Sequence, residues 1–148
     1  MPKIIKDGAV VDDGWSGQLL DLESYNTAVG AGTAPAEDIG VLLEPGEEPA
    51  GIAGDISAIP LIAINFPVFT DGRGFSYARE LRQRGYSGEI RAVGSFIRDQ
   101  LAYLKRCGVN AFAFDADIDL EAALASLQGF SDHYQADVVQ NEPLFRRR

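Results

Sequence analysis

The segment Asp71-Gly72-Arg73-Gly74, with Ser76 close behind it, combines side chains that suit a small anion. The planar guanidinium of Arg73 matches sulfate, phosphate or carboxylate, and the flanking glycines let the backbone approach a ligand closely or adopt positive φ. The alternative is a tight turn in which Asp71 accepts hydrogen bonds from the glycine N–H groups and pairs with an arginine. We weigh a ligand site and such a turn equally.

The position of this segment in the chain favours a site. It follows the apolar run 61–69 and precedes residues with the spacing of a helix. In parallel α/β sheets, ligands bind beyond the carboxyl ends of the strands, where helices begin with free N–H groups. The sequence therefore predicts where a ligand would bind, without specifying a reaction.

Arg91 is a second candidate, because it interrupts a strand that is otherwise apolar. A charge in such a position is unfavourable unless an opposite charge pairs with it. A structural ion pair is the preferred interpretation, and a contact to a ligand is the alternative. The expected partners, and further polar groups at the same edge, are Asp71, Asp99, Asp115, Ser95 and Gln100.

Composition indicates a single globular domain. The chain has 148 residues, of which 46% are hydrophobic and 24% charged, which is enough for one well-packed core. No apolar run approaches the roughly 20 residues of a membrane helix, and the N-terminus lacks the apolar stretch of a secretory signal. We therefore expect a soluble, cytoplasmic protein that does not bind membranes.

Several chemistries lack their sequence signals. The single cysteine, Cys107, and the single histidine, His133, are too few for a tetrahedral zinc site or an iron–sulfur cluster. There is no glycine-rich dinucleotide or nucleoside-triphosphate fingerprint, no Cys-x-x-Cys pair and no Gly-x-Ser-x-Gly elbow. No metal and no cofactor is visible in the sequence, so a redox role would need electrons from a partner or from a loosely bound flavin.

The charge is unevenly distributed along the chain. Residues 1–70 have a net charge of −9, residues 71–110 of +4, and residues 111–148 of −4. A positive block in an acidic protein attracts a small anion or an acidic partner, whereas the overall charge argues against binding nucleic acid. For the three arginines within residues 79–84, a solvated helix face is the preferred interpretation.

The first third of the chain, residues 1–37, reads as an appendage to the core. Asp7-Gly8 lies between two apolar stretches and predicts a tight hairpin. Asp21 can cap a short helix over residues 22–29, after which a run of small residues predicts a loop.

Residues 38–130 alternate between short apolar runs and helical spacing, which predicts a core of repeated β-α units. The expected strands cover residues 41–43, 61–66, 89–93 and 111–114. The expected helices follow them: a weak one over 49–59, one from 75 to about Gly85, one from Ser95 to Gly108, and one from Asp117 or Asp119 to Gly129.

Four such units predict an α/β protein with a small parallel sheet, because helical crossovers connect parallel strands. The sheet would be open, with helices on both faces, or would form half of a barrel. Half a barrel needs a second copy to close it, so a homodimer is one possibility. Residues 131–148 form a tail that ends in Arg146, Arg147 and Arg148, and no role is assigned to it.

Within residues 66–76 the chain reads Phe-Pro-Val-Phe-Thr-Asp-Gly-Arg-Gly-Phe-Ser, and residues 88–94 read Gly-Glu-Ile-Arg-Ala-Val-Gly. With Asp99-Gln100, Arg106 and Gly108, these segments resemble a bacterial family often labelled "oxidoreductase probably involved in sulfite reduction". Genes of that family commonly neighbour those for sulfite reductase and other enzymes of sulfate assimilation. The resemblance is strong over about residues 60–114.

The resemblance implies a role in reducing sulfite, and it implies no catalytic residue or cofactor. Ser95 departs from the family pattern, which commonly has an acidic residue there, so a carboxylate role at this position is not expected. Two hypotheses remain. The favoured one is an accessory protein that binds an anion or docks on sulfite reductase. The other is an enzyme that acts on a small oxyanionic sulfur compound, with Asp71, Arg73 and Arg91 as its catalytic candidates.

Overall fold

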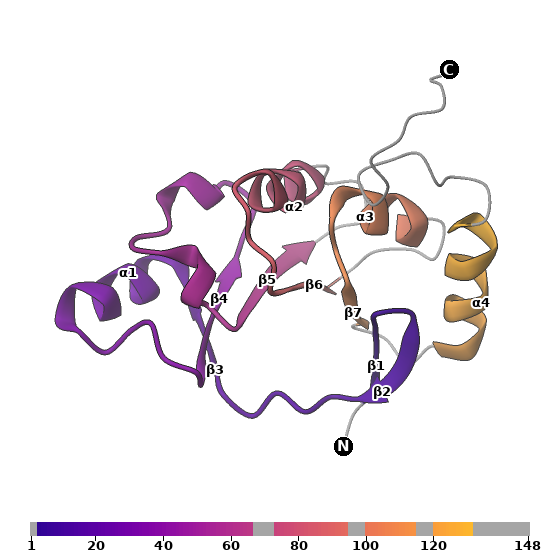
Figure 1. Ribbon diagram of the computed structural model, residues 1–148, viewed down its shortest axis with the longest axis horizontal. Helices are drawn as coiled ribbons and strands as arrows, with labels where there is room; N and C mark the ends of the chain where they lie inside the picture. Colours follow the sequence, from indigo (N-terminus) through magenta and orange to yellow (C-terminus); the bar gives the residue numbers. More distant parts are fainter. Residues whose placement is uncertain (1–2, 67–72, 95–99, 115–119, 132–148) are drawn as a thin grey trace.

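The computed structural model describes residues 3–66, 73–94, 100–114 and 120–131, which form one seven-stranded sheet with helices packed against it (Figure 1). The strand order is β2-β1-β7-β6-β5-β4-β3. The strands are β1 Lys3–Lys6, β2 Ala9–Asp12, β3 Gln18–Asp21, β4 Ile39–Leu43, β5 Leu61–Phe66, β6 Glu89–Gly94 and β7 Ala111–Phe114. The helices are α1 Leu22–Ala31, α2 Arg73–Gln83, α3 Leu101–Cys107 and α4 Leu120–Ser131.

The five strands β3 to β7 are parallel and lie in the sheet in the order of the chain. Because right-handed crossovers that always advance in one direction put every helix on the same side, the helices cover one face of the sheet. Figure 1 shows α2 and α3 above the strands and the segment that joins β2 to β3 below them. The α/β class is confirmed, and the arrangement is half-barrel-like. Of the two alternatives left open by the sequence, an open sheet with helices on both faces is the one that this arrangement does not match.

The N-terminal third belongs to the sheet and is not an appendage. The predicted hairpin is present, with Asp7 and Gly8 at positive φ between β1 and β2. However, β1 also pairs antiparallel with β7, with Ile5 opposite Phe112. At the other edge, the unpredicted strand β3 pairs with β4. The parallel sheet therefore has five strands instead of about four, and the hairpin extends it to seven.

Local sequence signals account for several of the helix ends. Asp21 caps α1, since its carboxylate accepts a hydrogen bond of 2.8 Å from the backbone N–H of Ser24. Gly108, at a φ of 116°, ends α3 as predicted. Two predictions failed. Residues 49–59 form two 3-10 turns, η1 Pro49–Gly51 and η2 Ile56–Ala58, with Gly54 at positive φ between them, and α4 continues past Gly129.

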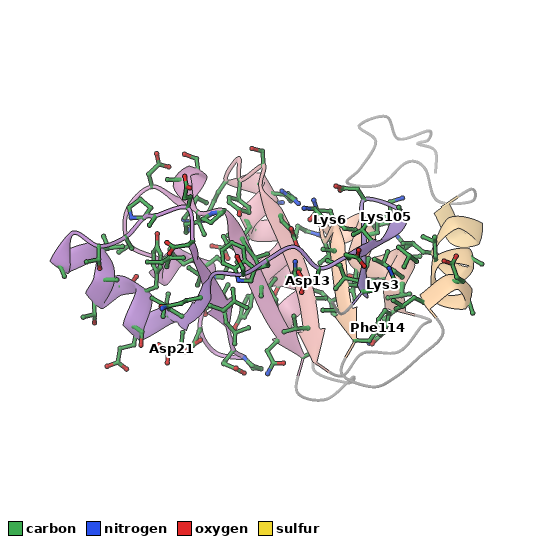
Figure 2. The ribbon with its side chains drawn as sticks, turned by 90° about the horizontal axis from the view of Figure 1, so that it is seen from below. Lys3, Lys6, Asp13, Asp21, Lys105 and Phe114 are labelled. Atoms are coloured by element: carbon green, nitrogen blue, oxygen red, sulfur yellow. The ribbon has the colours of Figure 1, made fainter. Side chains whose placement is uncertain are left out.

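The main core lies between the sheet and the helices. The side chains of Ile62, Ile64 and Phe66 point into it from β5, and each is almost fully buried. The alternate residues of β5 face the other side of the sheet, which is crossed by the segment 13–17 that links β2 to β3. Figure 2 shows this segment in front of the strands, with Asp13 on it. We call residues 13–17 the strap.

Candidate functional site

The structure describes only part of the residues predicted to form a site. Asp71, Gly72, Ser95, Asp99 and Asp115 lie outside the described residues, so the predicted ligand loop stays a prediction. The helix that follows it is as expected: Arg73 and Gly74 open α2, with only their backbone described, and Ser76 is exposed in its first turns. Gln100 immediately precedes α3.

The described part of the carboxyl edge is a polar cluster around Glu44, which follows β4. The Asn65 side chain donates a hydrogen bond of 2.8 Å to the Glu44 carboxylate from the neighbouring strand β5. The backbone N–H of Glu44 donates to the carboxylate of Glu47, and the N–H of Gly46 donates to the Tyr77 hydroxyl of α2. This part of the edge therefore carries two carboxylates, which oppose an anion unless a cation such as Arg73 offsets them.

Gly94, at the end of β6, lies against the same cluster. Its φ is 95°, and a Cβ atom there would lie 2.4 Å from the Oδ1 atom of Asn65 and 2.7 Å from the carbonyl oxygen of Phe66. A side chain at this position therefore meets both a strained backbone and a filled space. The glycine allows the end of β6 to lie directly against the Asn65 side chain at the end of β5.

We expect Gly94→Ala to lower the free energy of unfolding by at least about 2 kcal/mol, because positive φ costs about 1–2 kcal/mol and overpacking adds about 1–3 kcal/mol. Urea titration of the purified protein measures the change. The control is Gly30→Ala, in α1, where a Cβ atom meets nothing within 4 Å and φ is not positive. That variant should be neutral or slightly stabilised. If Gly94→Ala were as stable as the wild type, neither the positive φ nor the close contact with Asn65 would require a glycine at this position.

Arg91 lies on the face of the sheet that points away from the helices, where its side chain binds the strap. Its side chain is 7% exposed, and its guanidinium contacts the Asp13 carboxylate at 3.0 Å and the Glu89 carboxylate at 2.8 Å. The predicted ion pair is thus confirmed in kind. Among the described residues its partners are Asp13 and Glu89. The expected partners Asp71, Asp99 and Asp115 lie outside the described residues. Asp13 contacts Arg91 because the strap crosses this face. The residues next to Arg91 in the chain do not indicate that the strap lies there.

The arginines of the basic block have different roles. Arg84 forms an exposed pair with Glu80 one turn before it, at 2.9 Å, as expected for a solvated helix face. Arg82 instead donates hydrogen bonds to the carbonyls of Gly108, Tyr86 and Gly88, at 2.8–2.9 Å. For Arg82, the expectation of a solvated face was wrong, because the end of α2 lies against the turn that follows α3.

The exposed surface of α2 and α3 contains an aromatic side chain among arginines. Tyr103, 40% exposed, is in edge contact with Phe75 at 5.0 Å, and Phe75 in turn contacts the core ring of Phe66 at 5.6 Å. The guanidinium carbon of Arg106 lies 5.3 Å from the centre of the Tyr103 ring. Tyr103 is thus an exposed ring held in place by contacts that continue into the core.

Arg79 completes this surface from α2. Its guanidinium donates to the sulfur of the buried Cys107 at 3.4 Å. That sulfur, and to a lesser extent the Tyr103 hydroxyl, raise the pKa of Arg79. We call Phe75, Arg79, Tyr103 and Arg106 the Tyr103 surface. Sequence reasoning did not single it out, although Tyr103 lies outside the inward stripe formed by Leu101 and Leu104, which was a usable signal.

The described residues contain neither a cluster of metal ligands nor a membrane-spanning helix. No three histidine, cysteine, aspartate or glutamate side chains of this part gather as metal ligands would. Within the same residues, no helix combines the length and apolar character needed to cross a bilayer.

Comparison with known proteins identifies the family of the chain. Residues 40–145 match the model of a family described as "Bacterial protein of unknown function (DUF934)". No curated protein and no solved structure matches the chain. The matched region begins at β4 and includes both the carboxyl edge and the Tyr103 surface.

Proposed function

Because the chain belongs to the bacterial DUF934 family, we propose that it is an accessory protein of assimilatory sulfite reduction that docks on sulfite reductase through the Tyr103 surface. Two observations support the proposal. The segments 66–76 and 88–94 resemble a family whose genes neighbour those for sulfite reductase. The observation that carries the docking role is Tyr103 itself, an exposed ring next to arginines on a protein of net charge −9.

The chemistry of the Tyr103 surface suits a protein partner. Tyrosine and arginine are the residue types that most often dominate the energy of protein interfaces. A ring that is already fixed by Phe75 loses little conformational freedom on binding. The partner surface should be acidic and contain an apolar pocket, since Arg79 and Arg106 flank the ring.

The enzyme hypothesis has less support from the described residues. A small oxyanion at the carboxyl edge would meet Glu44 and Glu47, and Arg91 is paired with two carboxylates on the opposite face of the sheet. Of the three catalytic candidates, Asp71 and Arg73 therefore remain at the predicted loop. Calorimetric titration of sulfite into the protein alone tests this alternative, since turnover or tight binding without a reductase would favour it.

Tyr103→Ala is expected to weaken binding to the sulfite reductase encoded in the same genome by about 30-fold or more, the loss typical of an interface hot spot of at least 2 kcal/mol. Arg79→Glu should weaken it further at low ionic strength, since reversing the charge repels an acidic partner. Biolayer interferometry with immobilised reductase measures both effects.

The matched control is Arg84→Glu. It reverses an exposed charge just after the end of α2, but Arg84 pairs with Glu80 and is not part of the Tyr103 surface. Affinity should then stay within about threefold of the wild type, because single exposed charges contribute about 0–1 kcal/mol. If the wild type does not bind the reductase, or if the Tyr103 and Arg84 variants behave alike, the docking proposal fails.

A further inference from the structure

A second feature of the helix-covered side is a cavity at the amino edge of the sheet, opposite the edge that the sequence singled out. It has a volume of about 470 Å³, which is within the range of small-molecule sites. The hairpin turn, the ends of α2 and α3, the start of β7 and Leu127 of α4 line it, and one side is open to solvent. The lining residues that matter here are Asp7, Arg82, Lys105, Val109, Phe112 and Leu127.

Arg82 gives this cavity a fixed positive charge. Its Nε and Nη1 atoms donate to three backbone carbonyls, and these bonds orient the guanidinium without neutralising it. Arg91 differs, since it is paired with two carboxylates. Gly108 makes the approach possible, because a Cβ atom there would lie 2.4 Å from the Cγ atom of Arg82. Arg82 stays charged at neutral pH, as arginine does throughout proteins.

Lys105 adds a second positive charge at the rim. It is half-buried in the last turn of α3, and within the described part of the chain its ammonium has no hydrogen-bond or ion-pair partner. Asp7 opposes the two cations from the hairpin turn, where it accepts a hydrogen bond of 3.3 Å from the Asn110 side chain. The three charged groups therefore leave the cavity with one net positive charge.

The rest of the lining is apolar. Val109, Phe112 and Leu127 are almost fully buried, yet each contributes to the wall of the cavity. We propose that this cavity binds a small organic anion, with its apolar body against Phe112 and Leu127 and its negative group between Lys105 and Arg82. An inorganic anion would leave the apolar wall unused. The site is separate from the Tyr103 surface, and the proposal does not depend on docking.

Two fluorescent probes with the same aromatic body test the proposal. Anilinonaphthalene sulfonate carries a negative group, and phenylnaphthylamine lacks it. The full-length protein should bind the sulfonate saturably, with one site per chain, and should bind the neutral probe at least tenfold more weakly. Lys105→Gln should weaken binding of the sulfonate roughly tenfold, the effect of losing one charge-assisted hydrogen bond, and leave the neutral probe unchanged.

A variant that binds the sulfonate more tightly provides a second test, because misfolding would lower the affinity and not raise it. Asp7→Asn removes the opposing charge, keeps the acceptor for Asn110 and tolerates the positive φ of 52°. It should tighten binding of the sulfonate about two- to fivefold at low salt. The control Arg84→Gln removes a cation that lies just after α2 and does not line the cavity, and it should leave binding of the sulfonate unchanged.

Three outcomes would contradict the proposal that this cavity binds an organic anion. One is equal affinity for the two probes. Another is unchanged sulfonate binding in Lys105→Gln or Asp7→Asn. The third is a loss in Arg84→Gln as large as that in Lys105→Gln, which would mean that overall charge, not this cavity, attracts the probe.

Discussion

Arg91→Met lowers the free energy of unfolding by about 3–5 kcal/mol, the loss expected when one partner of a buried ion pair is removed. The variant leaves the carboxylates of Asp13 and Glu89 without their shared partner, at side-chain exposures of 19% and 12%. Glu89 keeps its contact with Lys6 at 3.0 Å, but Asp13 loses its ion pair with the sheet. We therefore expect the strap to detach as well. Urea unfolding measures the stability, and hydrogen exchange of residues 13–17 reports the strap.

Two further variants separate the buried charge from the loss of a cation in general. Lys3→Met removes an exposed cation that also pairs with an aspartate, Asp12, and it should change stability by less than about 1 kcal/mol. Adding Asp13→Asn and Glu89→Gln to Arg91→Met neutralises the stranded carboxylates and should restore part of the loss. A loss below about 1 kcal/mol in Arg91→Met alone would show that this ion pair does not hold the strap.

Arg82→Met is expected to lower the free energy of unfolding by about 2–4 kcal/mol, since three backbone carbonyls lose a charged donor at once. Those carbonyls belong to Gly108, Tyr86 and Gly88, so one side chain connects the turn after α2, the approach to β6 and the turn after α3. The side chain also packs over the Tyr86 ring, at 5.8 Å, which the unbranched methionine partly preserves. Thermal and urea unfolding should agree on the loss.

Arg84→Met is the matched control, because it removes an arginine two residues away whose single described partner is the exposed Glu80. We expect a change within about 0.5 kcal/mol. Arg82→Lys keeps the charge but cannot donate to three carbonyls in the plane of a guanidinium, so its stability should fall between those of the wild type and Arg82→Met. Equal stability of Arg82→Met and Arg84→Met would mean that solvent replaces the carbonyl contacts without loss.

The elements that the sequence predicted well are those whose signals are local. The run 61–66 is almost wholly apolar, and a strand covered on both faces is its usual structure. Asp21 and Gly108 mark helix ends because their effect depends on backbone groups a few residues away. The helix expected over 49–59 failed for the same kind of reason: Gly54 adopts positive φ, which interrupts the helix that the spacing of isoleucines favoured.

The predicted anion site stays a prediction, because Asp71 and Gly72 lie outside the described residues. The carboxyl edge contains Glu44, Asn65 and Gly94 side by side, because the parallel strands β4, β5 and β6 all end there. The Tyr103 surface and the cavity beside Arg82 depend on how α2 and α3 pack, and spacing within a single helix does not determine this. Arg73 and its neighbours remain the sequence-based prediction for an anion at the carboxyl edge.

The sequence by itself determined the α/β class, the order of the elements from β5 to α4, and the hairpin at Asp7-Gly8, because each follows from periodicity or turn chemistry within a few residues. The tertiary structure alone decided that this hairpin pairs with β7 and that the strap crosses the face opposite the helices. Asp13 and Arg91 are 78 residues apart in the chain. A charge in a strand requires a partner, but only the folded chain determines which carboxylate lies within reach.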